Sequence, residues 1–180
     1  MILIGLGANL PFEGAAPKTT LSRALRRMEG RGIAVRAVSS IYASPPKPLS
    51  GQPWFANLVA RIETRLGPEA LLAELHALEA RMSRTRRVRW AARTLDTDII
   101  DYHGAVVDRP DLALPHPRMA ERLFVLEPLA EIAPLWRHPV TGEGVAALLR
   151  RARPGETLIR VATAPISRDM PHKKAGALRF

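Results

Sequence analysis

The chain has 180 residues, of which 47% are hydrophobic and 24% charged, so we expect one domain with a buried core. It contains no cysteine, which excludes disulfide frameworks, thiolate metal sites and cysteine nucleophiles and suits a cytoplasmic location. Lys and Arg number 27 against 17 acids, a formal net charge of +10, which favours nucleic acid, a membrane surface or a phosphorylated small molecule as partner.

The first third of the chain predicts a strand, a helix and a second strand. Residues 2–6 form a short apolar run that predicts a buried strand, followed by a turn in Gly5-Leu-Gly-Ala-Asn9. The run is too short to span a bilayer and lacks a basic leader, so we expect no signal peptide. Helical spacing of apolar residues predicts a helix over 20–28, and alternation from 33 predicts a strand to about 42.

The middle of the chain predicts a loop, a strand and a helix. Residues 44–53 hold four prolines, which excludes a helix or a central strand. Alternation over 55–63 predicts a third strand. The segment from Gly67 to Met82 predicts an amphipathic helix that begins near Pro68.

The Arg-rich stretch that follows is interpreted as a loop, residues 94–100 as a fourth strand and 112–117 as a turn region. Helices are expected over 123–132 and 145–149 and a last strand over 158–161. The order β-α-β-β-α-β predicts an α+β fold of the ferredoxin-like, split βαβ type, with an antiparallel sheet. We expect one domain over 1–162 and a basic, poorly ordered tail over 163–180.

Asp96 and Asp98 are the sharpest chemical feature of the sequence. They stand two residues apart in a predicted strand, which places both carboxylates on one face. Neighbouring carboxylates repel unless a positive charge lies between them, and Mg²⁺ accepts one or two carboxylates together with phosphate oxygens and waters. The alternative is two solvated aspartates on an exposed face. Asp101 falls on the opposite face and is interpreted as a solvated turn residue.

A run of arginines precedes this pair: Arg81, Arg84, Arg86, Arg87, Arg89 and Arg93, with no acid among them. Guanidinium groups beside metal-binding carboxylates are typical of a polyphosphate site. The alternative is a solvated basic surface or a nucleic-acid patch. No P-loop is present, since Gly5 and Gly7 lack the rest of such a motif.

Other candidates are weaker by themselves. Trp90 stacks on a planar ligand or anchors the loop, and Asn57 with Phe55 suits a flat heterocycle, although Phe55 is as well explained by the core. His116 lies between two prolines and is either a phosphate donor or a satisfied polar residue. His76 and Glu79 by themselves are typical exposed helix residues.

Together these motifs resemble one family. Arg84-Thr-Arg-Arg87 and Arg93-Thr-Leu-Asp96-Thr-Asp98-Ile99 are similar to the signature of 6-hydroxymethyl-7,8-dihydropterin pyrophosphokinases. Further pieces follow in the family's order over about residues 1–162: Gly5-Leu-Gly7-Ala-Asn9, Pro53-Trp-Phe-Ala-Asn57, Leu114-Pro-His116, Arg122-Leu-Phe124 and Glu131-Ile-Ala-Pro134. Ala91-Ala92 departs from the Gly-Pro usual in the family.

The resemblance implies an enzyme that transfers the β,γ-pyrophosphoryl group of ATP to the hydroxymethyl oxygen of the pterin and releases AMP, in folate biosynthesis. It implies ATP as co-substrate and two Mg²⁺ ions, with Asp96 and Asp98 as metal ligands. We expect a monomer that binds these small molecules and neither nucleic acid nor a membrane.

The resemblance also assigns the remaining residues. It implies catalytic roles for Arg84, Arg93, Asp96 and Asp98. It implies nucleotide contacts for His76, Glu79, Arg84, Arg87, Arg89, Trp90, Arg93, Ile99, His116 and Arg122. It implies a pterin pocket formed by Ser44, Pro45, Pro46, Lys47, Phe55, Asn57, Trp90, Asp96 and Phe124.

Two rival functions follow from the residues themselves. A ferredoxin-like RNA-binding module would fit the expected fold and the basic charge, but strands 33–42 and 55–63 lack the aromatic pattern that such modules use. A two-metal nuclease would use the same two aspartates.

Overall fold

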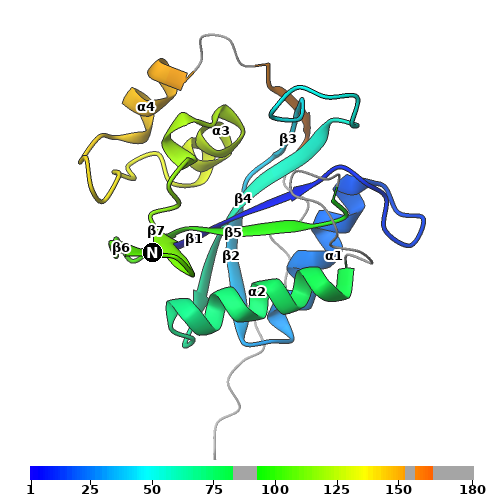
Figure 1. The fold of residues 1–180 in the computed structure, drawn as a ribbon, viewed down its shortest axis with the longest axis horizontal. Helices are drawn as coiled ribbons and strands as arrows, with labels where there is room; N and C mark the ends of the chain where they lie inside the picture. The colour runs from blue at the N-terminus through cyan, green and yellow to red at the C-terminus, as the bar shows by residue number, and fades with distance from the viewer. Residues whose placement is uncertain (83–92, 153–156, 164–180) are drawn as a thin grey trace, which may run out of the picture.

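The computed structural model describes residues 1–82, 93–152 and 157–163 and has a mixed α+β fold built on an antiparallel sheet (Figure 1). The sheet has six strands in the order β5-β1-β4-β3-β8, and β2 also pairs with β4. The strands are β1 (Ile2–Ala8), β2 (Ile33–Val38), β3 (Ile41–Ser44), β4 (Phe55–Thr64), β5 (Asp96–Tyr102) and β8 (Ile159–Ala162). The predicted last strand is thus confirmed to within one residue.

Helices cover both faces of the sheet and give the described part of the chain three layers. One face packs against α1 (Pro17–Glu29) and α2 (Pro68–Met82), which both begin at a proline. The other face packs against α3 (Leu123–Ile132), α4 (Val145–Ala152) and the short 3₁₀ helix η1 (Met119–Glu121). Alternate residues of β1 enter the two cores, since Ile2 and Ile4 face the first pair of helices and Leu3 faces the second.

The predicted strand over 33–42 is wrong in one respect, because it is broken at Ser39 and Ser40 into β2 and β3. Both parts pair with the long strand β4, β2 along its second half and β3 along its first. At the break the Ser39 hydroxyl accepts a hydrogen bond from Val59 N at 3.0 Å, and Ser40 bonds to Glu131 of α3. Side-chain bonds therefore replace part of the strand ladder here.

Residues 112–117 were interpreted as a turn region, but residues 112–114 form a strand. β7 (Leu112–Leu114) pairs with β6 (Val107–Arg109) in a separate two-stranded sheet. Each strand has only three residues, which is too short for a period of two to be visible in the sequence.

A β-bulge in β5 overturns the prediction for Asp101. Leu3 pairs with Asp101 and Ile4 with Ile99, so Ile100 is an extra residue that has no partner on β1. The extra residue reverses the alternation, and Asp101 lies on the same face as Asp96 and Asp98. It is only 4% exposed, and its carboxylate accepts hydrogen bonds of 2.8 Å from Trp136 Nε1 and from Gly104 N.

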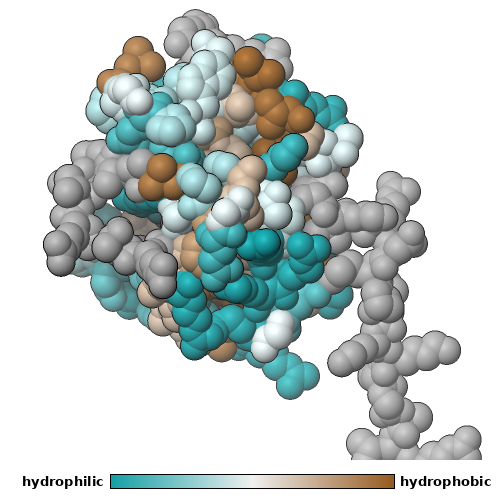
Figure 2. All heavy atoms as spheres, turned by 90° about the vertical axis from the view of Figure 1, so that its right-hand side faces the viewer, coloured by the Kyte–Doolittle hydropathy of each residue, from teal (hydrophilic) through white to brown (hydrophobic). Residues whose placement is uncertain are grey.

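Residues 83–92, most of the Arg-rich stretch, lie outside the described residues, as do 153–156 and 164–180. The expected tail therefore stays a prediction. In the part of the chain that is described, no helix is long and apolar enough to cross a membrane. The surface turned to the viewer in Figure 2 is hydrophilic over its lower half and carries apolar side chains in its upper part.

Candidate active site

A cavity of about 360 Å³ lies against the α3 face of the sheet and brings most of the predicted site residues together. Its volume is in the range of small-molecule sites. The predicted residues that line it are Ser44, Pro45, Pro46, Lys47, Phe55, Asn57, Arg93, Asp96, Asp98, His116, Arg122 and Phe124. They come from β3, β4, β5, the proline-rich loop, the residues just before β5, the segment that leads into α3 and the start of α3.

The two carboxylates lie beside glycines of β1. Asp96 pairs with Gly7 and Asp98 with Gly5, so both acids line the cavity with no side chain between them and the neighbouring strand. Burial and the charge of Asp98 raise the pKa of the Asp96 carboxyl to about 6, against the opposing charge of Arg93. A cation bound beside Asp96 would therefore offset its repulsion by Asp98 and favour the ionised carboxylate.

Arg93 forms an ion pair with Asp96 and is held by Asn9, which is 2% exposed. Asn9 Oδ1 accepts a hydrogen bond from Arg93 N at 2.7 Å, and Asn9 N donates to Arg93 O at 2.9 Å. The Asn9 amide also donates to Gln52 Oε1 and to the carbonyl of Pro53, both at 3.2 Å. One buried asparagine thus joins the proline-rich loop to the arginine beside the carboxylates.

The bulge in β5 also places His116. The carbonyl of Ile100 accepts a hydrogen bond of 3.0 Å from His116 N, and His116 Nδ1 accepts one of 3.3 Å from Arg118 N. In the neutral ring the proton is therefore on Nε2, which lies 3.8 Å from Asp98 Oδ2. Burial lowers the pKa of His116, and the charges of Arg122 and Arg118 lower it further against the opposing effect of Asp98.

Asn57 and two aromatic rings form the rest of the cavity wall. Asn57 is 6% exposed and its amide donates to Ser44 Oγ at 3.0 Å. A Cβ atom on Gly7 would lie 3.1 Å from Asn57 Oδ1, so glycine leaves room for this amide. Phe55 and Phe124 line the same cavity, and the Arg122 guanidinium lies 5.4 Å from the centre of the Phe124 ring. Rings and an amide suit a flat heterocycle.

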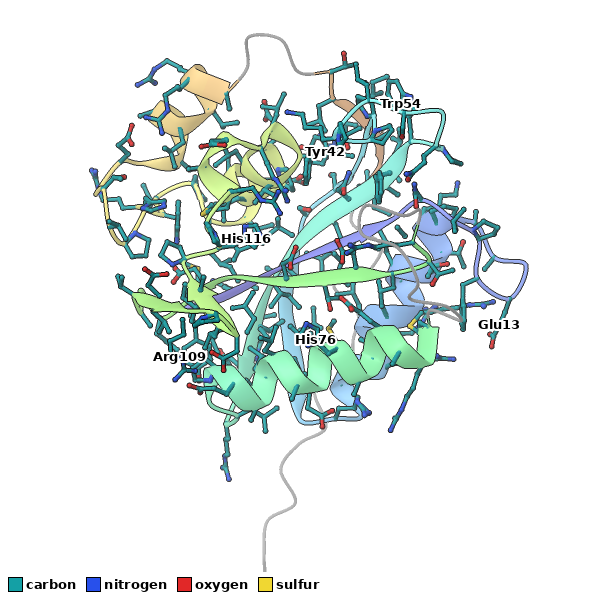
Figure 3. All side chains as sticks on the ribbon, viewed as in Figure 1. Glu13, Tyr42, Trp54, His76, Arg109 and His116 are labelled. Atoms are coloured by element: carbon teal, nitrogen blue, oxygen red, sulfur yellow. The ribbon has the colours of Figure 1, made fainter. Side chains whose placement is uncertain are left out.

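Three predicted nucleotide contacts lie elsewhere. His76 is exposed on α2, on the other side of the sheet from His116 (Figure 3). Ile99 packs in the core between the sheet and α1 and α2. Glu79 by itself was expected to be exposed, and this is wrong: it is 2% exposed and accepts hydrogen bonds from Thr97 N and Thr97 Oγ1 at 2.7 and 3.0 Å.

Four further predicted residues, Arg84, Arg87, Arg89 and Trp90, lie outside the described residues. The site residues predicted from the sequence do not include Gly7, Gln52 and Arg118, which also line the cavity. Only Gly7 carried a signal, since it belongs to the glycine motif that contributed to the family resemblance. Gln52 and Arg118 are polar residues in irregular segments, where no periodicity indicates a direction.

The donors fit a divalent cation only in part. Among the described residues, no group of three or more Asp, Glu, His or Cys side chains is placed to hold a metal. Asp96 and Asp98 alone match Mg²⁺ in its usual phosphate-bound form, in which substrate oxygens and waters complete the octahedron. The raised pKa of Asp96 is consistent with such a site.

The fold and the site define an α+β protein with a carboxylate and arginine pair beside an aromatic, amide-lined cavity. The chain belongs to the 7,8-dihydro-6-hydroxymethylpterin-pyrophosphokinase (HPPK) family, whose model matches residues 3–134. The wild-type HPPK-DHPS of Plasmodium falciparum shares the fold with a TM-score of 0.64 at 14% identity, over 83% of this chain and 40% of that one.

Two sequence relatives bear this out. A 2-amino-4-hydroxy-6-hydroxymethyldihydropteridine pyrophosphokinase of Methylorubrum extorquens is 41% identical over 73% of this chain and 81% of its own length. The folic acid synthesis protein fol1 of Pneumocystis carinii is 37% identical over 83% of this chain, which spans only 20% of that protein.

Proposed function

We propose that this protein transfers the β,γ-pyrophosphoryl group of ATP to the hydroxymethyl oxygen of 6-hydroxymethyl-7,8-dihydropterin and releases AMP, as a step of folate biosynthesis. The observation that carries the proposal is one cavity lined both by Asp96, Asp98 and Arg93 and by Asn57 and two phenylalanines. The first group suits a polyphosphate and the second a pterin. The family match supports the same activity.

Gly7 connects the two groups, since it pairs with Asp96 on one side and with Asn57 on the other. A heterocycle bound at Asn57 therefore has its hydroxymethyl arm within reach of the carboxylates. The oxygen of that arm forms a bond to the β-phosphorus, and the bond from the β-phosphorus to the oxygen bridging the α-phosphate breaks, so that this oxygen leaves on AMP. The protein contributes position and countercharge rather than a covalent intermediate.

Three side chains of the cavity have defined tasks in this transfer. Asp96 lies beside the place where the hydroxymethyl arm is expected and accepts the proton of the hydroxymethyl group. Arg93 binds phosphate oxygens from its place beside Asp96. His116 presents Nε2–H toward the space at Asp98, where it donates to a phosphate oxygen.

We further propose that two Mg²⁺ ions bind with ATP at Asp96 and Asp98. Bound there, they would neutralise phosphate charge and lower the pKa of the attacking hydroxyl. Arg84, Arg87, Arg89 and Trp90 are proposed to contact the nucleotide, with Trp90 also at the pterin. His76, Glu79 and Ile99 keep their nucleotide assignment only as a prediction, because none of the three lines the cavity.

We also propose a fold class for the protein. The sheet order β5-β1-β4-β3 supports a ferredoxin-like classification for the core, with the second strand split in two. A monomer, a cytoplasmic location and the absence of nucleic-acid and membrane partners stay predictions. The matches give no support to the RNA-binding alternative, since the matched family is a pyrophosphokinase family.

The direct test is AMP release from ATP in the presence of Mg²⁺ and the pterin alcohol. We expect AMP and the pterin pyrophosphate to form in equal amounts. ATP hydrolysis to ADP and phosphate, or no AMP at all, would contradict the proposal. Single-stranded RNA in place of the pterin serves as control and is expected neither to bind nor to be cleaved, which also tests the nuclease alternative.

A further inference from the structure

A second hollow of about 260 Å³ opens beside the cavity and is strongly basic. Its walls are Lys47, Pro48, Arg118, Glu121 and Arg122. All of these except Glu121 also line the larger cavity, so the two spaces adjoin. A ligand in the larger cavity can therefore extend into the smaller one.

The charge of this hollow has no counterpart on the pterin alcohol. Three of its five lining residues are cationic and one is acidic, whereas the hydroxymethyl group of the alcohol is neutral. Lys47 belongs to the predicted pterin pocket, and the Arg122 guanidinium lies over the ring of Phe124 in that pocket. The cationic groups are thus placed beside the heterocycle, not at a separate part of the surface.

The hollow is also close to the place of transfer. The backbone N–H of Arg118 bonds to His116, whose other ring nitrogen faces Asp98. Arg118 and Arg122 also line the cavity that holds Asp96 and Asp98, so the hollow adjoins the segment that carries His116 toward the carboxylates.

We propose that Lys47, Arg118 and Arg122 form a subsite for the pyrophosphate group of the reaction product. Resting on the proposed function, this assigns Lys47 and Arg118 a role in holding the newly formed ester after AMP has left. The ester differs from the alcohol by a diphosphate that carries several negative charges, and guanidinium groups pair with phosphate oxygens two at a time. The subsite therefore makes the product bind more tightly than the substrate from which it forms.

The experiment is a set of calorimetric titrations in EDTA, so that no metal contributes to binding. The ligands are the pterin alcohol, the pterin pyrophosphate, inorganic pyrophosphate and a non-hydrolysable ATP analogue. The variants are Lys47→Met and Arg118→Ala, at exposed positions where the fold should tolerate a shorter or uncharged side chain. Arg65→Ala removes the same charge at an exposed position that neither hollow includes, and serves as the matched control.

We expect wild type to bind the pterin pyrophosphate more tightly than the alcohol. Each of Lys47→Met and Arg118→Ala should weaken product binding about tenfold, the usual effect of one charge-assisted contact. In Arg118→Ala, alcohol binding should stay within about twofold of wild type, and Arg65→Ala should bind every ligand as wild type does. Lys47→Met lies in the predicted pterin pocket, so it should weaken product binding by a larger factor than alcohol binding. In turnover assays both variants should show a product inhibition constant raised by the same factor.

Two results with the pterin pyrophosphate and the ATP analogue would each overturn the subsite, and so would one with inorganic pyrophosphate. In one, product binding is unchanged in Arg118→Ala and Lys47→Met; in the other, the ATP analogue loses as much affinity as the product, which would make the hollow part of the nucleotide site. Both outcomes are distinct from failure of the proposed function, in which wild type would form no AMP. Tight binding of inorganic pyrophosphate that neither variant weakens would also contradict the proposal.

Discussion

The ionised Asp96 carboxylate lowers the free energy of unfolding of the metal-free protein, so replacing Asp96 should make this protein more stable. Its pKa rises from 3.8 to about 6 on folding, so between these values the folded state binds the proton more readily than the unfolded chain. This contribution to stability is present at low pH and is lost as the pH rises from about 4 to about 6. One third of the side chain is exposed, which reduces the cost at neutral pH to about 1 kcal/mol.

We therefore expect Asp96→Asn to be about 1 kcal/mol more stable than wild type at pH 7 without metal, with the difference shrinking toward pH 4. Urea denaturation of both proteins across this range measures it. Asp96→Asn and Asp98→Asn should each lower kcat at least about a hundredfold, because a charge at the transferred group is lost. A nearly normal rate in either variant would refute the metal assignment.

Asn57 is buried and bonded to Ser44, so its amide has a fixed direction in the cavity. Asn57→Ala should weaken binding of the pterin by about 1–3 kcal/mol, the cost of leaving a buried polar partner unpaired. Separate titrations of pterin and ATP analogue provide the measurement. Equal losses for both ligands would show that Asn57 supports the fold of the cavity as a whole instead of reading the pterin.

For single residues, the sequence predicts an environment where the two-residue period of a strand alone decides which face a side chain occupies. The shared face of Asp96 and Asp98 follows from two-residue spacing and is confirmed by the cavity. The burial of Asp101 does not follow, because one bulge residue reverses the alternation and nothing in residues 96–102 marks it. The burial of Glu79 depends on Thr97, eighteen residues away, so the helix pattern alone gave the wrong environment.

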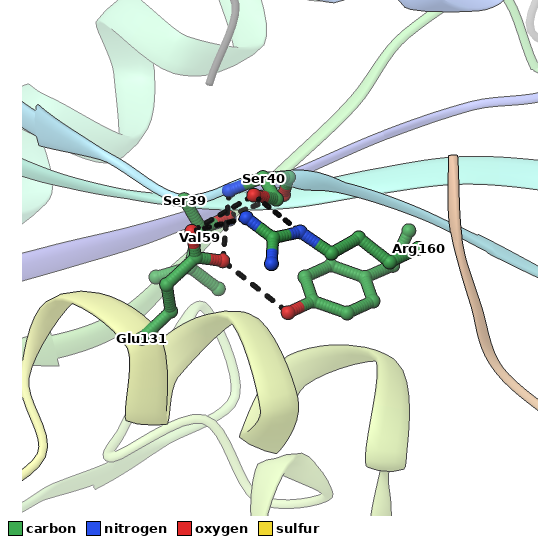
Figure 4. A network of polar contacts seen from close by, with 6 residues as sticks. Ser39, Ser40, Val59, Glu131 and Arg160 are labelled. Carbon is green, nitrogen blue, oxygen red and sulfur yellow. Dashed lines mark hydrogen bonds and ion pairs between the residues drawn. The ribbon is translucent and has the colours of Figure 1, made fainter. Parts of the chain in front are cut away.

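Among the elements, the junction of β3, α3 and β8 depends on one carboxylate (Figure 4). Glu131 of α3 accepts hydrogen bonds from Ser40 N at 2.9 Å, Ser40 Oγ at 2.8 Å and the Tyr42 hydroxyl at 3.2 Å. Arg160 of β8 donates to Ser40 Oγ at 2.9 Å and lies 3.6 Å from Glu131. The carboxylate therefore ties the strand break to the helix that forms one wall of the cavity.

We expect Glu131→Ala to lower the free energy of unfolding by about 2–3 kcal/mol, since the Ser40 N–H loses its partner. Arg160→Ala should cost less than about 1 kcal/mol, because 58% of the Arg160 side chain is exposed and solvent screens its charge. Urea denaturation of both variants is the measurement. The reverse order of the two losses would mean that β8, not α3, holds the strand break.

Element existence was largely predictable, and element junctions were not. The strands β1 and β4 and the helices α2 and α3 follow from periodicity and from their flanking prolines and glycines. The break at Ser39–Ser40 depends on Glu131, which lies 91 residues after Ser40, and β6 and β7 depend on each other. Interactions between distant segments leave no local pattern in a single sequence.

For the molecule as a whole, the cavity lies between the sheet and the segment that leads into α3, so a bound ligand contacts both layers. The nucleotide groups are expected at Asp96, Asp98 and Arg93, and the pterin groups at Asn57, with Gly7 of β1 between them. Each ligand should therefore limit the freedom of walls that the other also contacts. This arrangement predicts that the two ligands stabilise the fold cooperatively.

In a thermal unfolding experiment, an ATP analogue with Mg²⁺ and the pterin alcohol, each at a hundred times its dissociation constant, should each stabilise the fold by about 2.7 kcal/mol. For a chain of this size that is a rise in Tm of about 5–10 °C for each ligand. The rise with both ligands should exceed the sum of the separate rises.

Two controls accompany this measurement. Single-stranded RNA should give no rise in Tm. Asp98→Asn should lose the rise caused by the ATP analogue while keeping the rise caused by the pterin. Strictly additive rises in Tm would mean that binding of one ligand does not affect binding of the other. A rise in Tm with RNA that exceeds the rises with ATP analogue and pterin would favour a nucleic-acid-binding function for the basic surface.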